Sequence, residues 1–407
     1  MILELIVALL VGILAGTLTG LTPGIHINLI SVMLLSYVYT STNSFPPTLF
    51  AVFIISMAVT HTFVDFIPSI FLGAPEEDSF LSILPGHQLL LEGKGYDAVV
   101  YTAYGSIIAL FIILLLTPLF LGFLPSFYSL IQKSIGIILI LVSLFLILSE
   151  EKKLASLIIF ILSGFLGIAS LTLNIKEPLL PLLTGLFGAS TLIISIKQKT
   201  KIPEQKIMPI KYIILNKTDM VKGFCASVFS APFTSFLPGL GSSQSAIIGK
   251  QLFNIKDQKQ FLFLLGAINT IVMGLSFITL YSINKTRTGA AVAVSQLMPE
   301  LTTSNLILIL TIIISSGIIS FFLTIALAKF TAKNINKIKY EKLSFFIIIF
   351  LIIVIFLFSD FTIQGKIIAL TVFITSTSLG IFTILSGIKR IHLMGALIIP
   401  TILFHVF

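Results

Sequence analysis

Two short Pro-Gly stretches contain residue types that could bind an anion inside an apolar chain. The first includes Thr22, Pro23, Gly24, His26 and Asn28, and the second includes Pro238, Gly239, Gly241, Ser242, Ser243 and Gln244. Proline removes a backbone donor and glycine admits left-handed turns, so a helix breaks at each stretch. A helix that resumes after the break exposes N–H groups and a partial positive charge, which suit a carboxylate or phosphate oxygen. Each stretch therefore predicts an anion site, and the alternative is a proline kink packed by neighbouring helices.

Five residues in or beside apolar runs are candidates for binding a coupling cation. They are Asp65, Glu76, Glu77, Asp78 and Asn269. Acids in an apolar region are unfavourable unless they face water, a cation or a partner, and the run of three could also be solvated near the cytoplasmic face. Asp65 follows His61 by one helical turn, which fits either an ion relay or a structural pair. Asn269 could offer an oxygen to a cation or form a hydrogen bond between helices.

Two basic residues in the second half of the chain could neutralise an anionic substrate. Lys285 and Arg287 lie between two apolar runs. The planar guanidinium of Arg287 matches a carboxylate in bidentate geometry. The alternative is that both side chains extend to the outer membrane interface.

Composition indicates that a lipid bilayer surrounds these residues. Of the 407 residues, 57% are hydrophobic and only 10% are charged, whereas a soluble domain has about 25% charged residues. We therefore predict an all-α, polytopic protein of the plasma membrane. The formal net charge of +9 comes from Lys and Arg in short loops between apolar runs. This is the positive-inside pattern, and it argues against nucleic acid as a partner.

The sequence lacks the motifs that would indicate an enzyme. There is no His-Glu-x-x-His pair, nucleotide-binding loop, metal-spaced Cys or His, or nucleophile elbow. The single cysteine, Cys225, lies in an apolar setting typical of an inert packing residue. We therefore predict no catalysis, no metal centre and no cofactor, with Na+ as one option for a coupling ion.

The basic loops predict the order of the membrane elements. Apolar runs of spanning length occur near residues 47–72, 98–123, 132–149, 153–172, 178–196, 259–280, 303–328, 343–359, 361–386 and 391–405. If the basic linker 198–222 is cytoplasmic, the stretches 1–40, 73–90, 223–249 and 284–298 become re-entrant helical hairpins. The prediction is an inverted-topology repeat of residues 1–197 and 223–407, with about ten spanning helices plus four hairpins.

At these stretches the sequence resembles the large permease subunit of the tripartite tricarboxylate transporters, the TctA family, and in particular its archaeal single-chain relatives. The segments that carry the resemblance are Gly20–Gly24, Gly73–Pro75, Pro85–Gly86, Gly93–Gly95, Thr184–Gly188, Leu237–Gly241 and Thr286–Ala291. Each is short, so their order along most of the chain carries the likeness. The resemblance implies transport of small carboxylates, in bacterial members with a small membrane subunit and an extracytoplasmic binding protein.

The sequence thus predicts a secondary active transporter of a small organic anion, di- or tricarboxylate-like. Alternating access around the paired hairpin tips would be coupled to Na+ or H+ in symport. The alternative function is a transporter or flippase of a lipid-linked anion of the polyprenyl phosphate type, with a lateral opening beside Arg287. The expected partners are the anion and the bilayer. A homodimer, a small membrane subunit and an extracytoplasmic binding protein are left open.

Overall fold

The fold is all-α in the part of the chain that the structure describes. The computed structural model describes residues 2–22, 27, 30–31, 34–35, 38, 46–73, 83–173, 175, 178–197, 202–237, 241–286, 288–337, 340–358 and 362–406. Helices and their connecting turns make up these residues, and none of them forms a strand. The predicted helical class is confirmed.

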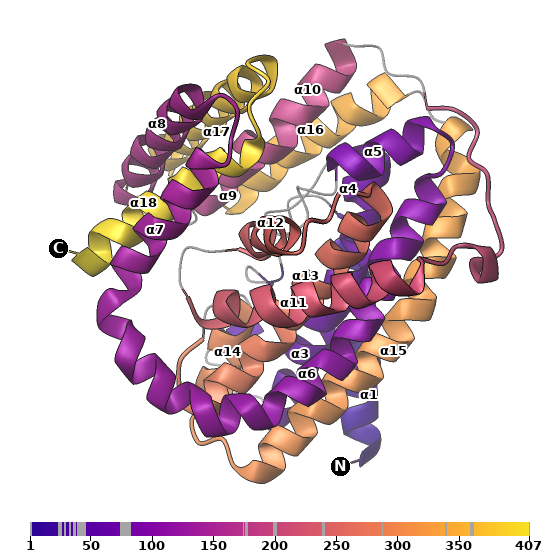
Figure 1. Ribbon diagram of the computed structural model, residues 1–407, viewed down its shortest axis with the longest axis vertical. Helices are drawn as coiled ribbons and strands as arrows, with labels where there is room; N and C mark the ends of the chain where they lie inside the picture. The colour runs from indigo at the N-terminus through magenta and orange to yellow at the C-terminus, as the bar shows by residue number, and fades with distance from the viewer. Residues whose placement is uncertain are drawn as a thin grey trace.

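Seventeen α-helices occur among the described residues (Figure 1). They are α1 (Ile2–Leu21), α3 (Pro47–Val64), α4 (Phe66–Leu72), α5 (Ile83–Leu91), α6 (Gly95–Ile131), α7 (Ile135–Leu148), α8 (Lys153–Thr172), α9 (Leu179–Leu183), α10 (Ser190–Lys197), α11 (Lys217–Phe236), α12 (Ser242–Leu252), α13 (Gln258–Ile283), α14 (Gly289–Leu297), α15 (Thr303–Asn334), α16 (Tyr340–Phe358), α17 (Ile363–Leu385) and α18 (Gly395–Val406). The 3-10 turns are η2 (Gln132–Ser134), η4 (Ile210–Tyr212), η5 (Ile335–Lys337) and η6 (Arg390–Met394), and η3 (Thr184–Ala189) is a π-helix.

Eight helical stretches among the described residues are long and apolar enough to cross a membrane. They are Ile2–Leu21, Pro47–Leu72, Gly95–Leu148, Lys153–Thr172, Leu179–Lys197, Gln258–Ile283, Thr303–Lys337 and Ile363–Leu385. A multi-pass membrane protein is therefore confirmed. Two further predicted spans coincide with α16 and with the shorter apolar stretch Arg390–Val406.

Two spans that the sequence separates lie in one continuous helical stretch. The predicted runs 98–123 and 132–149 fall within Gly95–Leu148, which is 54 residues long. The turn η2 joins α6 to α7 without a loop, and Figure 1 shows the stretch as a wide arc. Pro118 and Pro125 lie inside α6, and each removes a backbone hydrogen bond, which favours bending. The arc links two groups of helices.

The two groups lie on opposite sides of Figure 1. One contains α1, α3, α6, α11, α13, α14 and α15, and the other contains α7, α8, α10, α16, α17 and α18. In the first group α13 packs on α6 and α11, and α3 packs on α1 and α15. In the second group α8 packs on α18, and α17 packs on η3. The short helix α12 packs on α11 and α13.

Glycines let α6 and α13 cross with their backbones in contact. A Cβ atom added to Gly105 would lie 2.0 Å from the carbonyl oxygen of Phe263, and one added to Gly266 would lie 2.1 Å from that of Thr102. Ser106 Oγ donates a hydrogen bond of 3.0 Å to the Gly266 carbonyl across the same crossing. Small residues at such a crossing allow the close approach that drives helix association in a bilayer. This contact between the two halves of the chain holds α13 in the centre.

Polar contacts tie together two loops of the second group. Lys389 Nζ lies 2.8 Å from Glu150 Oε1, and Lys152 Nζ donates to the Ser386 carbonyl at 2.9 Å. Ser163 Oγ on α8 donates to the His392 carbonyl at 3.1 Å. The loop between α7 and α8 is therefore fastened to the loop between α17 and α18.

Part of the basic segment between the halves packs against the loop that joins α5 to α6. Gln205 is buried, and its Oε1 accepts a hydrogen bond of 2.8 Å from Gly95 N–H while its Nε2 donates to the Leu90 carbonyl at 3.0 Å. Gly93, at φ +77°, leaves room for the carbonyl of Glu204, which would lie 2.9 Å from an added Cβ. The linker predicted at 198–222 thus includes the non-helical residues 202–209 and the first turns of α11.

Candidate functional site

A bend between α3 and α4 places Asp65 in the centre of the protein. Pro68 has no N–H to bond the carbonyl four residues earlier, so the helix ladder is interrupted beside Asp65. Asp65 is only 2% exposed, in an apolar region where a carboxylate needs a polar partner. Asn269 on α13 supplies one, because its Nδ2 donates a hydrogen bond of 3.1 Å to Asp65 Oδ2. Two residues predicted to bind the coupling ion are therefore brought together.

Buried hydroxyl groups also link α3 to three other helices. Asn269 Nδ2 also lies 3.5 Å from the carbonyl oxygen of Thr62, on α3. The other contacts are Thr62 Oγ1 with Thr270 Oγ1 at 3.1 Å, His61 Nδ1 with Thr19 Oγ1 at 3.1 Å, and Ser320 Oγ with Thr60 Oγ1 at 2.8 Å. Polar side chains on α3 thus contact α1, α13 and α15 in an apolar core. Carboxylate, amide and hydroxyl oxygens are the ligands that hard cations prefer.

The other acids proposed for the coupling ion, Glu76, Glu77 and Asp78, lie outside the described residues. Among the residues that the structure does describe, no group of three or more His, Cys, Asp or Glu side chains is placed to hold a metal ion. The prediction for the three acids stays a prediction.

The start of α12 is the best described part of the second Pro-Gly stretch. Gly241 is the N-cap, in extended conformation, and Gln244 Oε1 accepts a hydrogen bond of 2.7 Å from its N–H. This is half of a capping box, and the glycine has no side chain to supply the other half. The first turn of the helix therefore keeps backbone N–H groups that no cap side chain of Gly241 satisfies.

Two side chains at the start of α12 are fully buried donors that lack an acceptor among the described residues. Gln244 and Ser245 are both 0% exposed, and neither Gln244 Nε2 nor Ser245 Oγ has a hydrogen-bond partner there. A buried donor left unpaired is unfavourable by about 1–3 kcal/mol. Ser242 and Ser243 are buried beside them. The described residues of the second stretch are thus assembled at a helix N-terminus with donors that could bind an anionic oxygen.

Ser245 was not predicted from the sequence. The signal was present, because Ser242-Ser243-Gln244-Ser245 is an unbroken polar run at the start of a helix. Helical periodicity does not single out Ser245, since only packing against α11 and α13 determines that its hydroxyl is enclosed. Pro238 and Gly239 lie outside the described residues.

Of the first Pro-Gly stretch, the structure describes Thr22. It follows the last residue of α1, and its Oγ1 donates to the Leu18 carbonyl at 2.7 Å. Pro23, Gly24, His26 and Asn28 lie outside the described residues. Whether the first tip faces the second therefore stays a prediction.

The connection between α13 and α14 lies at the edge of the protein. Asn284 ends α13 in the left-handed conformation at φ 52°, and Thr288 caps α14 by accepting from the Ala291 N–H at 3.3 Å. Lys285 is exposed, and its ammonium lies 5.0 Å from the centre of the Tyr128 ring. Lys285 is thus placed as expected for an interfacial lysine. Arg287 lies outside the described residues.

Comparisons with known proteins identify the family of the chain. The model of the tripartite tricarboxylate transporter TctA family matches residues 6–395. An uncharacterized protein of the archaeon Methanocaldococcus jannaschii is 31% identical over 396 residues, which cover 94% of each chain. No solved structure matches the chain. Because the family model covers almost the whole sequence, the chain belongs to the tripartite tricarboxylate transporter TctA family.

Proposed function

We propose that the chain is a secondary transporter that couples the movement of a small di- or tricarboxylate to a cation gradient. The observation that carries the proposal is the pair of buried donors, Gln244 Nε2 and Ser245 Oγ, without an acceptor among the described residues at the start of α12. A carboxylate oxygen would accept from both and would also meet the positive end of the helix. Membership of a transporter family supports the same function.

Access from both sides of the membrane follows if the chain is an inverted repeat. Supporting this, equivalent helices pack alike in the two halves. In the first half, α3 packs on α1 and also on α15, which belongs to the second half. In the second half, α13 packs in the same way on α11 and also on α6, which belongs to the first half. In inverted-repeat transporters, broken helices in equivalent positions line the substrate site near the bilayer midplane. The breaks after α1 and before α12 would be such a pair.

We further propose that Asp65 and Asn269 form the coupling site. A carboxylate that shares a buried cluster with an amide and several hydroxyl groups can exchange a proton or bind Na+ through hard oxygen ligands. Asp65 directly follows α3, and Asn269 lies on α13. In chain order α3 comes after the break that follows α1, and α13 comes after the break that precedes α12. A cation there would neutralise Asp65, and the charge change could bias which side of the membrane is open.

The test is uptake into proteoliposomes that contain the purified chain alone. Radiolabelled citrate, malonate and succinate are offered with an imposed Na+ gradient, a pH gradient or none. We expect one of these carboxylates to accumulate only with a gradient, and the gradient that works identifies the ion. Uptake by the chain alone would show that it needs no binding protein or small membrane subunit.

A substitution at the proposed site makes the uptake test specific. Gln244→Ala removes one buried donor and should lower uptake at least tenfold, since a hydrogen bond to a charged group is worth about 1.5–3 kcal/mol. Gln132→Ala, at an exposed glutamine on η2 that lies in neither site, is the matched control and should transport normally. Equal uptake by both variants would remove the start of α12 from the mechanism.

A further inference from the structure

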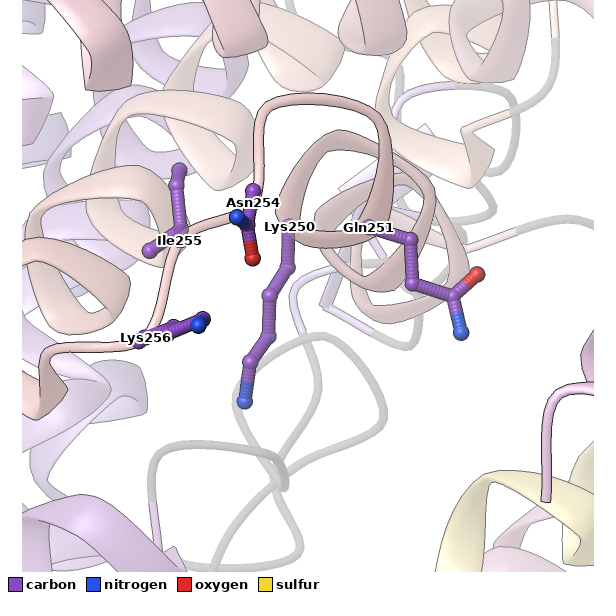
Figure 2. A pocket seen from close by; sticks show the side chains of 5 residues that line it. All are labelled: Lys250, Gln251, Asn254, Ile255 and Lys256. Carbon is purple, nitrogen blue, oxygen red and sulfur yellow. The ribbon is translucent and has the colours of Figure 1, made fainter.

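A hollow at the far end of α12 gathers two lysines that the proposed mechanism has not used. It measures about 500 Å³ and is lined by Lys250, Gln251, Asn254, Ile255 and Lys256. Figure 2 shows Lys250 between Lys256 and Gln251, with the Lys250 side chain extending away from the helix. The residues come from the last turn of α12 and the loop that leads to α13.

The local backbone explains how this end of α12 is fixed. Asn254 adopts the left-handed conformation at φ 48°, and the Ile255 N–H donates to the Lys250 carbonyl at 2.9 Å. The Asn254 N–H donates to the Gln251 carbonyl at 3.3 Å. These two bonds are those of a Schellman motif, which ends a helix and satisfies its last carbonyl groups. The loop therefore holds Lys256 beside the turn that carries Lys250.

Lys250 is a partly buried cation without a carboxylate partner in the described structure. Its ammonium lies 4.6 Å from the centre of the Phe261 ring, a cation–π contact. Burial lowers the pKa of Lys250 below 10.5, and the positive charge of Lys389 lowers it further. Both effects disfavour the charged ammonium.

Two acidic side chains among the described residues, one next to Lys256 in the chain and one beside Lys389, are already engaged. Asp257 accepts the Gln260 N–H at the start of α13, and Glu150 is paired with Lys389. The dipole of α12 favours a cation at its C-terminus by about 0.3–1 kcal/mol. That accounts for one lysine, but it does not account for the convergence of Lys250 and Lys256 with Lys389 nearby. Like charges around one hollow are stabilised by an anion that lies between them.

The hollow lies at the opposite end of α12 from the proposed substrate site. Lys250 is six residues from Gln244 and five from Ser245, which is about 7–9 Å along the helix axis. The positive-inside rule puts the loop of Lys250 and Lys256 on the cytoplasmic side. The lysines would then stand at the cytoplasmic approach to the buried donors of Gln244 and Ser245.

We propose that this hollow binds a small di- or tricarboxylate and is the cytoplasmic entry and exit site for the transported anion. Lys250 and Lys256 pair with its carboxylate oxygens before it reaches, or after it leaves, the start of α12. The inference rests on the proposed transport function, but the residues that test it are different. Anionic lipid headgroups present similar oxygens, so the experiment separates the two sources.

The chain contains no tryptophan, which allows a single reporter to be placed in the hollow. Phe261→Trp sets an indole beside the Lys250 ammonium and retains the cation–π contact. The full-length variant is placed in nanodiscs of neutral phosphatidylcholine and titrated with citrate. We expect a saturable change in emission. Lys250→Gln and Lys256→Gln in this background should each weaken citrate binding about tenfold, and Lys250→Arg should preserve it.

Lys337→Gln is the control, because Lys337 is exposed on η5 and contacts Asn334. It should leave the titration unchanged. If the reporter variant is poorly folded by circular dichroism, equilibrium dialysis of radiolabelled citrate with Lys250→Gln and Lys337→Gln replaces the fluorescence measurement.

Three outcomes would overturn the inference. The first is no saturable citrate response from the reporter, and the second is unchanged affinity in Lys250→Gln. The third is a response to nanodiscs that contain phosphatidylglycerol but not to citrate, which would assign the hollow to lipid. If the reporter shows no citrate binding but Gln244→Ala still loses uptake as expected, the proposed transport function stands and only the site at the hollow is excluded. If Lys250→Gln weakens citrate binding but Gln244→Ala transports normally, the start of α12 is excluded as the substrate site.

Discussion

The side-chain amide of Asn269, on α13, donates a hydrogen bond of 3.1 Å to Oδ2 of Asp65 at the bend between α3 and α4. The two residues are 204 positions apart and belong to different halves of the chain. A change of charge at Asp65 is therefore felt directly by the central helix of the other half. This link is where ion binding and movement of the halves would be coupled.

Asp65→Asn should uncouple transport without preventing it. The substitution nearly preserves shape but removes the charge, so a cation loses its main ligand. We expect gradient-driven accumulation of the carboxylate to fall at least about tenfold, equivalent to about 1.4 kcal/mol, while exchange of carboxylate across the membrane continues. Radiolabel accumulation and counterflow in the same proteoliposomes measure the two. Asp219→Asn, at the start of α11, is the control, and full accumulation by Asp65→Asn would exclude the coupling role.

Gly105→Ala should destabilise the protein, whereas Gly122→Ala on the same helix should not. The added methyl at Gly105 overlaps the Phe263 carbonyl, so α6 and α13 must separate, but nothing lies within 4 Å of a Cβ at Gly122. Overpacking of this kind destabilises by about 1–3 kcal/mol, and alanine at an open helical site stabilises by up to about 1 kcal/mol. Thermal unfolding followed by circular dichroism compares them. Equal unfolding midpoints for the two variants would contradict the close backbone contact between α6 and α13.

The predicted sidedness can be checked with single cysteines. Cys225 is the single cysteine of the chain, so Cys225→Ser gives a clean background. We expect a cysteine at Lys206 to react with an impermeant thiol reagent only after cells are opened, and one at Lys285 to react in intact cells, because the basic linker should be cytoplasmic. Both lysines are exposed. If both cysteines are labelled from the same side of the membrane, the predicted inverted topology is wrong.

As the pH is raised, citrate binding at the hollow should weaken at a lower pH than it would with a lysine of unshifted pKa. The pKa of Lys250 is below 10.5 because of burial and then the charge of Lys389, so its ammonium loses its proton earlier as the pH rises. Between the lowered pKa of Lys250 in the folded chain and its ordinary pKa in the unfolded chain, the unfolded chain holds more protons, so the free energy of unfolding rises with pH. Lys250→Arg stays charged and should hold citrate to higher pH in the Phe261→Trp titration. Identical pH profiles for lysine and arginine would contradict this assignment.

Sequence reasoning predicted the parts of the fold that depend on local composition. Long apolar runs between basic loops predict membrane helices, and seven of the eight spanning-length helices in the described residues overlap the predicted runs. The eighth, Ile2–Leu21, lies in the stretch predicted as a hairpin. The fusion of 98–123 with 132–149 was missed, because Pro125 in the intervening segment 124–131 is typical of a helix end, although α6 continues through it. Local composition does not indicate whether a short polar segment reverses the chain or only bends it.

The site was predicted in its residue types but not in its contacts. Asp65 and Asn269 were each singled out, but their hydrogen bond depends on how α3 and α13 pack, which neither local sequence encodes. Ser245 was missed because burial of its hydroxyl comes from neighbouring helices. The facing arrangement of the two Pro-Gly tips stays a prediction, since Gly24 and Gly239 lie outside the described residues.

Ser245→Ala tests the central claim that the start of α12 binds the transported anion. Thermal unfolding of the purified variant is measured with and without the carboxylate that most stabilises the unaltered protein. We predict that the midpoint without ligand is unchanged or higher, because an unpaired buried hydroxyl is removed. The increase in unfolding midpoint that the carboxylate causes should become smaller, by the amount expected if the carboxylate binds about 10–100-fold more weakly. Ser230→Ala, whose buried hydroxyl donates to the Ala226 carbonyl on the adjacent helix, should keep the full increase. A full increase in Ser245→Ala, or a loss of stability without ligand, would contradict the claim.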